Sequence, residues 1–460
     1  MNALLPVSAA TSALAPLLAR HDGRAPRYTS YPTAISFTND VDEAVYRTWL
    51  SQLDPGRAVS LYLHIPFCQR LCWYCGCNTR AVSKASLVSR YVELLIEEMS
   101  LLEAALPGHF RAGQIHLGGG TPNLLSRDDL TRLFRALRHV FKVSPGAEIA
   151  AELDPATLSR AWVQAAAFHG LSRASIGVQD LSPRVQKAVN RIESFEVVQQ
   201  AVGWLREVGV LSVNLDLMYG LPHQTTTDVL DTLDQVLTLA PERIALFGYA
   251  HVPWAKPHQK LIPEKALPGA LERFDQGEAA AARLAAEGYV RIGLDHFARE
   301  DDSLAASART GAMRRNFQGY TVDPYDVLLG LGASSIGRLP QGLVQNSPEE
   351  TRWQAQVQAG RLPVRKGVSL TPEDRFRSDI IERLMCDLAV DLKPICDAHG
   401  RSLSELDSSL ARLEPLEADG LVVCDGRKVT VTQIGRPFLR SACQAFDTRS
   451  NDPGAHARIV

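Results

Sequence analysis

Four of the eight cysteines fall within ten residues, in the segment Cys68-Gln-Arg-Leu-Cys72-Trp-Tyr-Cys75-Gly-Cys77. The first three are separated by three residues and then by two, which places three thiolates on one tight loop. A cluster with one iron left free would need this arrangement, and soft thiolates are the ligands that iron–sulfur clusters use. The spacing therefore predicts an iron–sulfur site held by Cys68, Cys72 and Cys75.

Three other uses of these thiols compete with this prediction. A structural zinc site would usually need a second pair of ligands well separated in sequence, and no second C-x-x-C pair occurs. A disulfide framework is typical of small secreted chains, whereas this chain has 460 residues and carries its other cysteines singly. A redox C-x-x-C motif would use Cys72 and Cys75 but would leave Cys68 and Cys77 unexplained. The spacing favours the iron–sulfur site over all three.

The residues ahead of the cysteine loop predict a strand. Val59, Leu61, Leu63 and Ile65 alternate with polar or aromatic neighbours, so they share one face, and Pro66 ends the pattern. The loop therefore follows the C-terminal end of a strand. Catalytic groups of α/β barrels lie at that end of the strands.

Five further strands follow, with helical segments between them. We expect strands at 114–117, 148–153, 173–178, 211–216 and 243–247, and helices near 87–106, 127–141, 157–169, 194–208 and 226–239. Strands that alternate with helices indicate parallel βαβ units. Six such units predict an α/β fold, an incomplete (β/α)6 barrel that is wider than the eight-unit form and can admit a large substrate.

Polar residues occupy the ends of the later strands. Glu152, Gln179, Asp216 and the stretch Tyr249-Ala-His251 lie at or just beyond the C-terminal ends of the third to sixth strands. Any one of them could be a satisfied polar residue, but four at corresponding positions predict a ring around a pocket. The run Gly118-Gly119-Gly120 follows the second strand, and its lack of Cβ atoms would let a ligand approach the backbone closely.

The stretch Tyr62-Leu-His-Ile-Pro-Phe-Cys68, continued by C-x-x-x-C-x-x-C, resembles the radical S-adenosylmethionine (SAM) enzymes. The added Cys77 in Cys75-Gly-Cys77-Asn78 resembles the oxygen-independent coproporphyrinogen III oxidases in particular. The likeness begins at Pro26-Arg-Tyr-Thr-Ser-Tyr-Pro-Thr33 and reaches the C-terminal domain.

This resemblance implies a [4Fe-4S] cluster, two molecules of SAM and an electron donor that reduces the cluster. It implies a 5′-deoxyadenosyl radical that abstracts hydrogen from propionate side chains of coproporphyrinogen III. Two propionates would lose carbon dioxide and become vinyl groups, giving protoporphyrinogen IX in haem biosynthesis.

The resemblance also implies individual residue roles. Cys68, Cys72 and Cys75 would bind the cluster, whereas Cys77 would be catalytic and not a ligand. The first SAM would contact Tyr62, Gly119, Gly120, Thr121, Glu152 and Ile336. The second would contact Tyr74, Gln179, Arg191, Asp216 and Ala250. His296 and the stretch Arg315-Asn-Phe-Gln-Gly-Tyr320 match family segments expected to line the porphyrinogen pocket.

The main rival hypothesis is a related haem chaperone, a binding protein that shares the three-cysteine motif. Such proteins typically lack the fourth cysteine and carry His-Asn-x-x-Tyr-Trp. This chain has Cys77 and carries Arg315-Asn-Phe-Gln-Gly-Tyr320 instead of the His-Asn-x-x-Tyr-Trp motif. Both features favour the oxidase.

We expect three regions along the chain: an N-terminal arm over 1–50, a barrel with an extension over 51–365, and a smaller, mainly helical domain over 366–460. The composition of 21–58 favours an extended segment. Helical runs at 372–390 and 403–418 precede a hairpin with an Asp425-Gly426 turn, a winged-helix-like arrangement. No cluster of Arg or Lys marks a recognition helix, so we expect a lid over the barrel and not a DNA-binding module.

Charge and hydropathy exclude several classes of partner. The net charge of −2 gives no field that would attract nucleic acid or an anionic membrane. No apolar run approaches the roughly 20 residues of a membrane span. Residues 1–20 lack a basic n-region, and Pro6 and Pro16 interrupt their apolar run, unlike a signal peptide. Isolated thiols suit a reducing compartment, so we expect a cytoplasmic protein, and nothing favours an assembly larger than a monomer.

Overall fold

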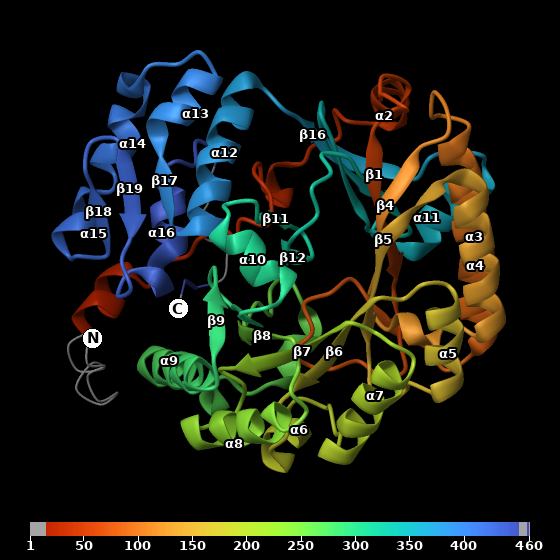
Figure 1. The fold of residues 1–460 in the computed structure, drawn as a ribbon, viewed down its shortest axis with the longest axis horizontal. Coiled ribbons are helices and arrows are strands. Elements are labelled where there is room, and N and C mark those ends of the chain that lie inside the picture. Colours follow the sequence, from red (N-terminus) through yellow and green to blue (C-terminus); the bar gives the residue numbers. More distant parts are fainter. Residues whose placement is uncertain (1–14, 450–457, 460) are drawn as a thin grey trace.

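The computed structural model describes residues 15–449, 458 and 459 of the chain. Its main feature is a twisted 12-stranded sheet with helices on its outer side and a smaller domain beside it (Figure 1). Residues 1–14 of the expected N-terminal arm lie outside the described residues.

Six parallel strands and the helices between them form the incomplete (β/α)6 barrel predicted from the sequence. The strands lie side by side in chain order: β1 (Ala58–Ile65), β4 (Arg111–Gly119), β5 (Lys142–Leu153), β6 (Arg173–Gln179), β7 (Ser212–Tyr219) and β8 (Arg243–Gly248). The helices are α3 (Ala85–Glu103), α4 (Arg127–Val140), α5 (Arg160–Phe168), α7 (Phe195–Glu207), α8 (Thr226–Leu237) and α9 (Ala270–Ala286).

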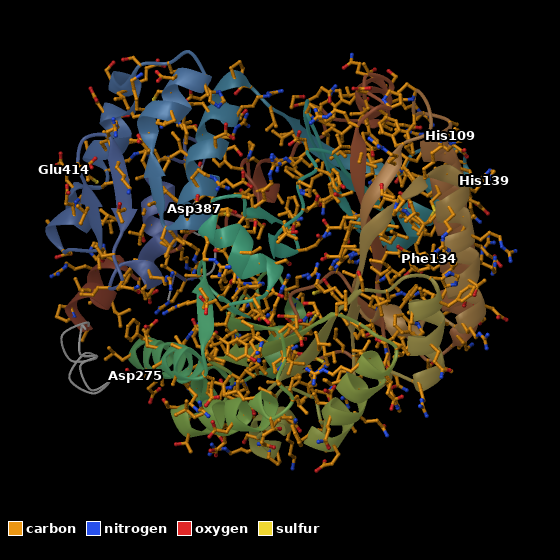
Figure 2. All side chains as sticks on the ribbon, viewed as in Figure 1. His109, Phe134, His139, Asp275, Asp387 and Glu414 are labelled. Atoms are coloured by element: carbon orange, nitrogen blue, oxygen red, sulfur yellow. The ribbon has the colours of Figure 1, made fainter. Side chains whose placement is uncertain are left out.

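The alternation along β1 buries one of its faces in the core. Leu61, Leu63 and Ile65 are fully buried on one face, as their spacing predicts. Side chains fill the space between the sheet and its helices (Figure 2). Phe134 of α4, for example, stacks on His169 with ring centroids 4.9 Å apart.

Short strands extend the sheet at both edges, and sequence reasoning did not identify them. β13 (Leu328–Leu331) pairs in parallel with β1, and β14 (Ile336–Leu339), β15 (Gly342–Asn346) and β16 (Val364–Ser369) continue in antiparallel fashion. At the other edge β10 (His296–Arg299) pairs antiparallel with β8 and with β9 (Tyr289–Ile292). The remaining barrel elements are β2 (Phe67–Cys68), β3 (Arg80–Ala81), α6 (Pro183–Ala188), α10 (Ser303–Arg309), β11 (Arg314–Asn316), β12 (Gly319–Thr321) and α11 (Glu350–Gln358).

The prediction of an extended segment over 21–58 is wrong at its C-terminal end, where Glu43–Ser51 form helix α2. Asp42 caps this helix by accepting a hydrogen bond from the Val45 amide at 3.0 Å. Tyr46, Trp49 and Leu50 are buried, at the i, i+3 and i+4 spacing of one helical face. The prolines and tyrosines earlier in the segment obscured this local pattern.

The C-terminal domain packs five helices against a small sheet. The helices are α12 (Pro372–Asp387), α13 (Leu392–Ala398), α14 (Asp407–Ala411), α15 (Glu414–Ala418) and α16 (Leu439–Gln444), and the sheet order is β17 (Ala389–Asp391), β19 (Lys428–Val431), β18 (Val422–Cys424). The hairpin turns at Asp425-Gly426, as predicted, with φ +81° at the glycine. The single helix predicted over 403–418 is instead three short pieces, and Pro415 lies in the first turn of the last one.

The arm is packed into this C-terminal domain. Leu18, Ala25, Tyr28 and Tyr31 belong to the same apolar core as the helices of the C-terminal domain. The Tyr28 hydroxyl donates to Asp447 at 2.9 Å, which fixes the arm to the end of α16. None of the described helices is both long and apolar enough to cross a membrane.

Candidate active site

The cysteine loop begins directly after β1 and closes on itself. β2, which contains Cys68, pairs in parallel with β3, so Phe67 lies opposite Arg80 and Cys68 opposite Ala81. The two ends of the loop are thereby fixed to one another at the C-terminal end of β1. Cys72 is buried, Cys68 and Cys75 are half-buried and Cys77 is exposed.

Each thiol has a distinct polar neighbour. The sulfur of Cys68 lies 3.1 Å from the Thr79 hydroxyl, and Arg191 donates to the sulfur of Cys72 at 3.6 Å. Burial raises the pKa of both Cys68 and Cys72. A hydrogen bond from Cys77 lowers the pKa of Cys75 to about 7 and raises that of Cys77.

A short segment after β8 holds the loop from the opposite side. His258 and Gln259 lie on the 3₁₀ helix η3 (Pro257–Leu261) and contact the carbonyls of Cys75 at 2.7 Å and of Tyr74 at 3.0 Å. Lys256 donates to the Cys77 carbonyl at 3.0 Å. Sequence reasoning missed all three residues, because their contacts are to backbone atoms 179 to 185 positions away.

The glycine run 118–120 lies beside this loop, and a side chain at Gly119 or Gly120 would clash with neighbouring atoms. Gly119 has φ +115°, and a Cβ there would lie 2.6 Å from the His64 ring. A Cβ on Gly120 would lie 2.6 Å from the Phe67 carbonyl oxygen. The run therefore brings bare backbone close to the loop that carries the cysteines.

Glu152 at the end of β5 faces this backbone. Its carboxylate accepts a hydrogen bond from the Gly119 amide at 2.9 Å and lies 3.2 Å from His116 Nε2. Burial raises the pKa of Glu152, but the bonds to His116 and Gly119 outweigh it and hold the pKa below its usual value. Tyr62 stacks on His116, with ring centroids 5.8 Å apart, and its hydroxyl lies 3.0 Å from His64 Nδ1. The two histidines, which the sequence did not single out, orient the tyrosine and the glutamate.

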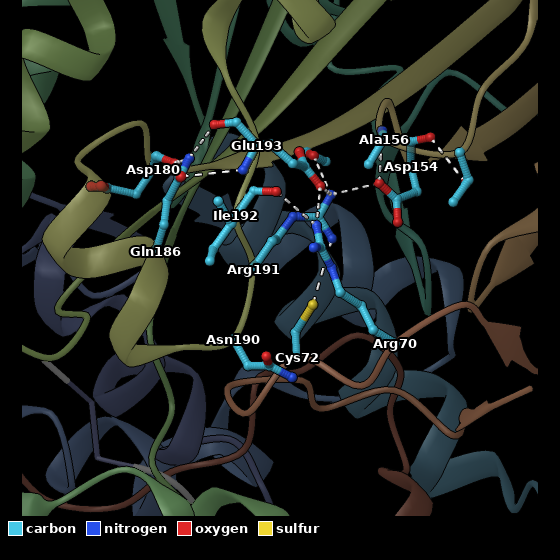
Figure 3. A network of polar contacts seen from close by, with 12 residues as sticks. Arg70, Cys72, Asp154, Ala156, Asp180, Gln186, Asn190, Arg191, Ile192 and Glu193 are labelled. Atoms are coloured by element: carbon cyan, nitrogen blue, oxygen red, sulfur yellow. Dashed lines mark hydrogen bonds and ion pairs between the residues drawn. The ribbon is translucent and has the colours of Figure 1, made fainter.

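Arg191 is the centre of a buried polar network (Figure 3). It donates to the Gly177 carbonyl at 2.5 Å and lies 3.0 Å from Glu193 and 3.4 Å from Asp154. Its Nε has no partner among the described residues. Burial raises the pKa of Glu193 to about 8 in spite of the arginine. The network therefore positions a guanidinium beside the Cys72 sulfur.

Asp216 lies on β7 between Ser175 and Asn214. Ser175 donates to one carboxylate oxygen at 2.9 Å and Asn214 to the other at 2.7 Å. Burial raises the pKa of Asp216 to about 6, and the negative charge of Glu152 adds to this rise. The third and fifth predicted strands thus carry carboxyl groups that influence each other.

These observations define one site, and comparisons with known proteins identify its family. Residues 62–236 match the radical SAM superfamily, and residues 370–438 match the HemN C-terminal domain. An oxygen-independent coproporphyrinogen III oxidase of Bradyrhizobium diazoefficiens is 47% identical over 439 residues, covering 95% of this chain and 97% of the relative. The corresponding protein of Paracoccus denitrificans is 42% identical, with coverage of 95% and 97%.

The chain belongs to the oxygen-independent coproporphyrinogen III oxidase family. The solved coproporphyrinogen III oxidase of Escherichia coli, described as a radical SAM enzyme, shares its fold, with a TM-score of 0.88 and 37% identity. That match covers 92% of this chain and 97% of the other. The chain is thus a radical SAM oxidoreductase, and its family implies a [4Fe-4S] cluster and SAM.

The side chains and backbone groups at this site fit a [4Fe-4S] cluster and SAM. Three thiols project from one clamped loop, and the glycine backbone and a carboxylate lie beside it. Among the described residues no three His, Cys, Asp or Glu side chains are grouped around a single-ion position. A cluster takes each cysteine on a different iron, so its ligands spread wider than those of one ion.

Within this oxidase-family site, most of the residues singled out from sequence come together. Gln259 joins two of them, because its amide contacts both the Tyr74 carbonyl and the Ala250 carbonyl, the latter at 3.3 Å. Gln179, with φ +71°, ends β6 beside Arg191. Thr121 is buried directly after the glycine run. Ile336, at the start of β14, lies against Gly330, which pairs with Tyr62 of β1.

Proposed function

We propose that this chain catalyses the oxygen-independent oxidative decarboxylation of coproporphyrinogen III. Two propionate side chains would become vinyl groups, giving protoporphyrinogen IX in haem biosynthesis. The observation that carries the proposal is the clamped loop of three thiols at the end of β1, beside bare glycine backbone and Glu152. Relatives named oxygen-independent coproporphyrinogen III oxidase match nearly the full length of the chain.

In this proposal Cys68, Cys72 and Cys75 bind the cluster. When bound, the cluster and SAM supply a one-electron reductant and a carbon-centred radical able to take hydrogen from substrate. The chain's own contribution is to fix the three thiols. The pairing of β2 with β3 and the contacts from His258 and Gln259 hold the loop in one shape.

The first SAM would bind along the glycine run. Its proposed contacts are Tyr62, Gly119, Gly120, Thr121, Glu152 and Ile336. Gly119 and Gly120 leave backbone accessible where a side chain would clash, and Glu152 is an ionised carboxylate that can attract a ligand ammonium group. His116 and Tyr62 restrict the glutamate to this orientation.

A second SAM would bind on the neighbouring strands. Its proposed contacts are Tyr74, Gln179, Arg191, Asp216 and Ala250. Support comes from Arg191, a buried cation beside Cys72 that could receive a ligand carboxylate, and from Gln259, which links Tyr74 to Ala250. Cys77 would act in the reaction without binding the cluster, and its exposure leaves it accessible to substrate.

Anaerobic turnover tests this function. The reconstituted protein is incubated with SAM, a strong one-electron reductant and coproporphyrinogen III, and carbon dioxide and protoporphyrin are measured after oxidation. Two molecules of carbon dioxide per protoporphyrin are expected. No turnover together with stoichiometric haem binding by a protein with an intact cluster would overturn the proposal in favour of a haem chaperone.

We further propose that the protein works as a cytoplasmic monomer that receives electrons from a separate donor protein. The support is that all eight cysteines are free thiols, as a reducing compartment allows. Light scattering on the purified, reconstituted protein should give the mass of one chain. A stable dimer mass across the working concentration range would refute the monomer.

A further inference from the structure

A cavity of about 470 Å³ lies where the barrel, the arm and the C-terminal domain meet. Seven arginines line it, and four of them come from four separate segments: Arg27 of the arm, Arg273 of α9, Arg315 of β11 and Arg440 of α16. In Figure 1, α9 and β9 (green) lie beside the C-terminal domain that carries α16 (blue). A cavity of this size suits a small molecule.

Three of these four arginines have guanidinium nitrogens without a partner among the residues that the structure describes. Nε of Arg273, Nε and Nη1 of Arg315, and Nε of Arg440 have no hydrogen-bond partner in the described part of the chain. Arg315 and Arg440 are only 8% and 6% exposed. Within the described residues none of the four forms an ion pair with a carboxylate. A buried polar atom without a partner is costly, so these nitrogens are available to hydrogen-bond a ligand.

The nearby carboxylates do not balance the four arginines. Glu278 pairs with Arg291 at 3.0 Å, and Asp22 pairs with Arg458 at 3.3 Å. Asp295 faces the cluster of arginines, but it is also bonded to His296 at 2.8 Å. Glu264, the fourth carboxylate of the wall, lies 3.7 Å from His251. The wall therefore carries four carboxylates against seven guanidinium groups.

Mutual repulsion is visible in the acid–base behaviour of these groups. Burial lowers the pKa of Arg27, and the charges of Arg315 and Arg273 lower it further. Burial also lowers the pKa of Arg440 to about 9, with a contribution from Arg27. The bonds and charges of His296 and Arg315 hold the pKa of Asp295 at about 2, against the effect of burial. Tyr320 and Asp295 raise the pKa of Arg315 in spite of its burial, so the positive field in the cavity is only partly compensated.

The four guanidinium groups are not equivalent. Arg440 donates to the Ala25 carbonyl at 3.0 Å and to the Ile459 carbonyl at 2.6 Å, and Arg27 donates to the Gly248 carbonyl at 3.3 Å. These two connect the arm to the domains around it. Arg315 lies 4.2 Å above the Tyr320 ring, which fixes its plane while leaving its Nε and Nη1 free. Arg273 and Arg315 are therefore the available donors.

The cavity opens at the ends of the barrel strands that carry the proposed reaction. Phe247, Gly248 and Ala250, at and beyond the end of β8, form part of its wall. The ring of the lining residue Phe247 packs edge-on against His296, with ring centroids 5.7 Å apart, and His296 in turn influences the pKa of Asp216 on β7. A molecule in the cavity could therefore reach the site of chemistry.

We propose that this cavity anchors the substrate by the carboxylates of the propionates that do not react, with Arg315 and Arg273 as the direct donors. The inference rests on the proposed function and names the side chains that would recognise the substrate. Coproporphyrinogen carries a propionate on each pyrrole ring, so two carboxylates survive both decarboxylations. Arginine forks bind carboxylates in a bidentate way that lysine cannot reproduce.

Binding of coproporphyrin III, the stable aromatic form with the same propionates, tests this anchor without turnover. Its fluorescence is titrated with full-length, cluster-loaded protein under anaerobic conditions. Arg315→Gln and Arg273→Gln should each raise Kd about 10- to 100-fold, the range expected for a lost charged hydrogen bond. Arg315→Lys should fall between wild type and Arg315→Gln, because it keeps the charge and loses the fork.

Arg283→Gln is the matched control. Arg283 lies on the same helix as Arg273 but pairs with Asp234 at 2.8 Å on the exposed side. Its loss removes the same charge, and Kd should change less than about twofold. Far-UV circular dichroism before each titration confirms that the variants are folded.

Wild-type protein should also bind coproporphyrin III more weakly as salt rises, and should bind etioporphyrin, which has no carboxylates, at least about 10-fold more weakly. Equal affinity for both porphyrins, or unchanged Kd in both glutamine variants, would overturn the anchor. If that happens while anaerobic turnover is normal, the proposed function stands and the anchor alone fails. Absence of both turnover and binding in wild type would instead refute the proposed function and the anchor with it.

Discussion

Replacing Arg191 with methionine should destabilise the barrel strongly, because this side chain is the cation of a buried network. Arg191 contacts the Gly177 carbonyl at 2.5 Å, Glu193 at 3.0 Å and Asp154 at 3.4 Å. The Glu193 and Asp154 side chains are 1% and 11% exposed, so water cannot replace the guanidinium. Breaking a buried ion pair by removing one partner costs about 3–5 kcal/mol. We expect Arg191→Met to fall in this range above pH 8, where Glu193 is ionised.

Arg184→Met tests whether burial, and not the distance between the charged atoms, determines the loss of unfolding free energy. Arg184 pairs with Asp228 at 2.9 Å, about as close as Arg191 to Glu193, but its side chain is 59% exposed. Exposed pairs contribute about 0–1 kcal/mol. Arg184→Met should therefore lower the unfolding free energy by no more than about 1 kcal/mol, although the two ion pairs have similar N···O distances.

Hydrogen exchange by mass spectrometry is the suitable assay, because a chain with two packed domains need not unfold in one step. Peptides from β6 and α6 report the local opening free energy in each anaerobic, cluster-free variant. Urea unfolding followed by circular dichroism provides the global value. The reasoning would be refuted if Arg191→Met lost no more stability than Arg184→Met in both measurements.

Two further predictions follow from single positions. Gly119→Ala should lower the unfolding free energy by about 1–3 kcal/mol, because φ +115° is strained for alanine and its Cβ would lie 2.6 Å from His64. Gly203→Ala in α7, which has open space around it, should instead raise the unfolding free energy by up to about 1 kcal/mol. The same urea titration measures both variants. Burial raises the pKa of Glu98 from 4.5 to about 7, so unfolding releases its proton between these values, and stability should fall by about 3 kcal/mol as pH rises from 4.5 to 7. Glu98→Gln should remove that component of the pH dependence; an unchanged pH profile would show that another group is responsible.

Local pattern in the sequence was enough to predict the barrel. The alternation from Val59 to Ile65 and the helical segments after each strand define parallel βα units, and the cysteine loop follows from the end of the first strand. β13 was not predictable in this way, because four residues near position 330 carry no period that marks them as a neighbour of β1. The arm helix α2 was missed because prolines dominate the composition of the segment before it.

In the candidate site, too, residues within sequence motifs could be predicted, whereas residues brought together only by the fold could not. Residues within motifs, such as Cys68 and Gly119, were identifiable from spacing. Gln259 and His258 were not, because they act through backbone carbonyls of a loop more than 180 positions away. The arginines of the cavity come from four segments that meet only in the folded chain, and no spacing in the sequence relates Arg27 to Arg440.

The central claim is that three of the four clustered cysteines bind the cluster and the fourth acts in the reaction. The most direct test is anaerobic turnover of Cys77→Ser, with iron content and cluster absorbance measured on the same sample. The account predicts a full complement of cluster iron and loss of carbon dioxide release from coproporphyrinogen III. Loss of the cluster in Cys77→Ser, or turnover at the wild-type rate, would contradict it.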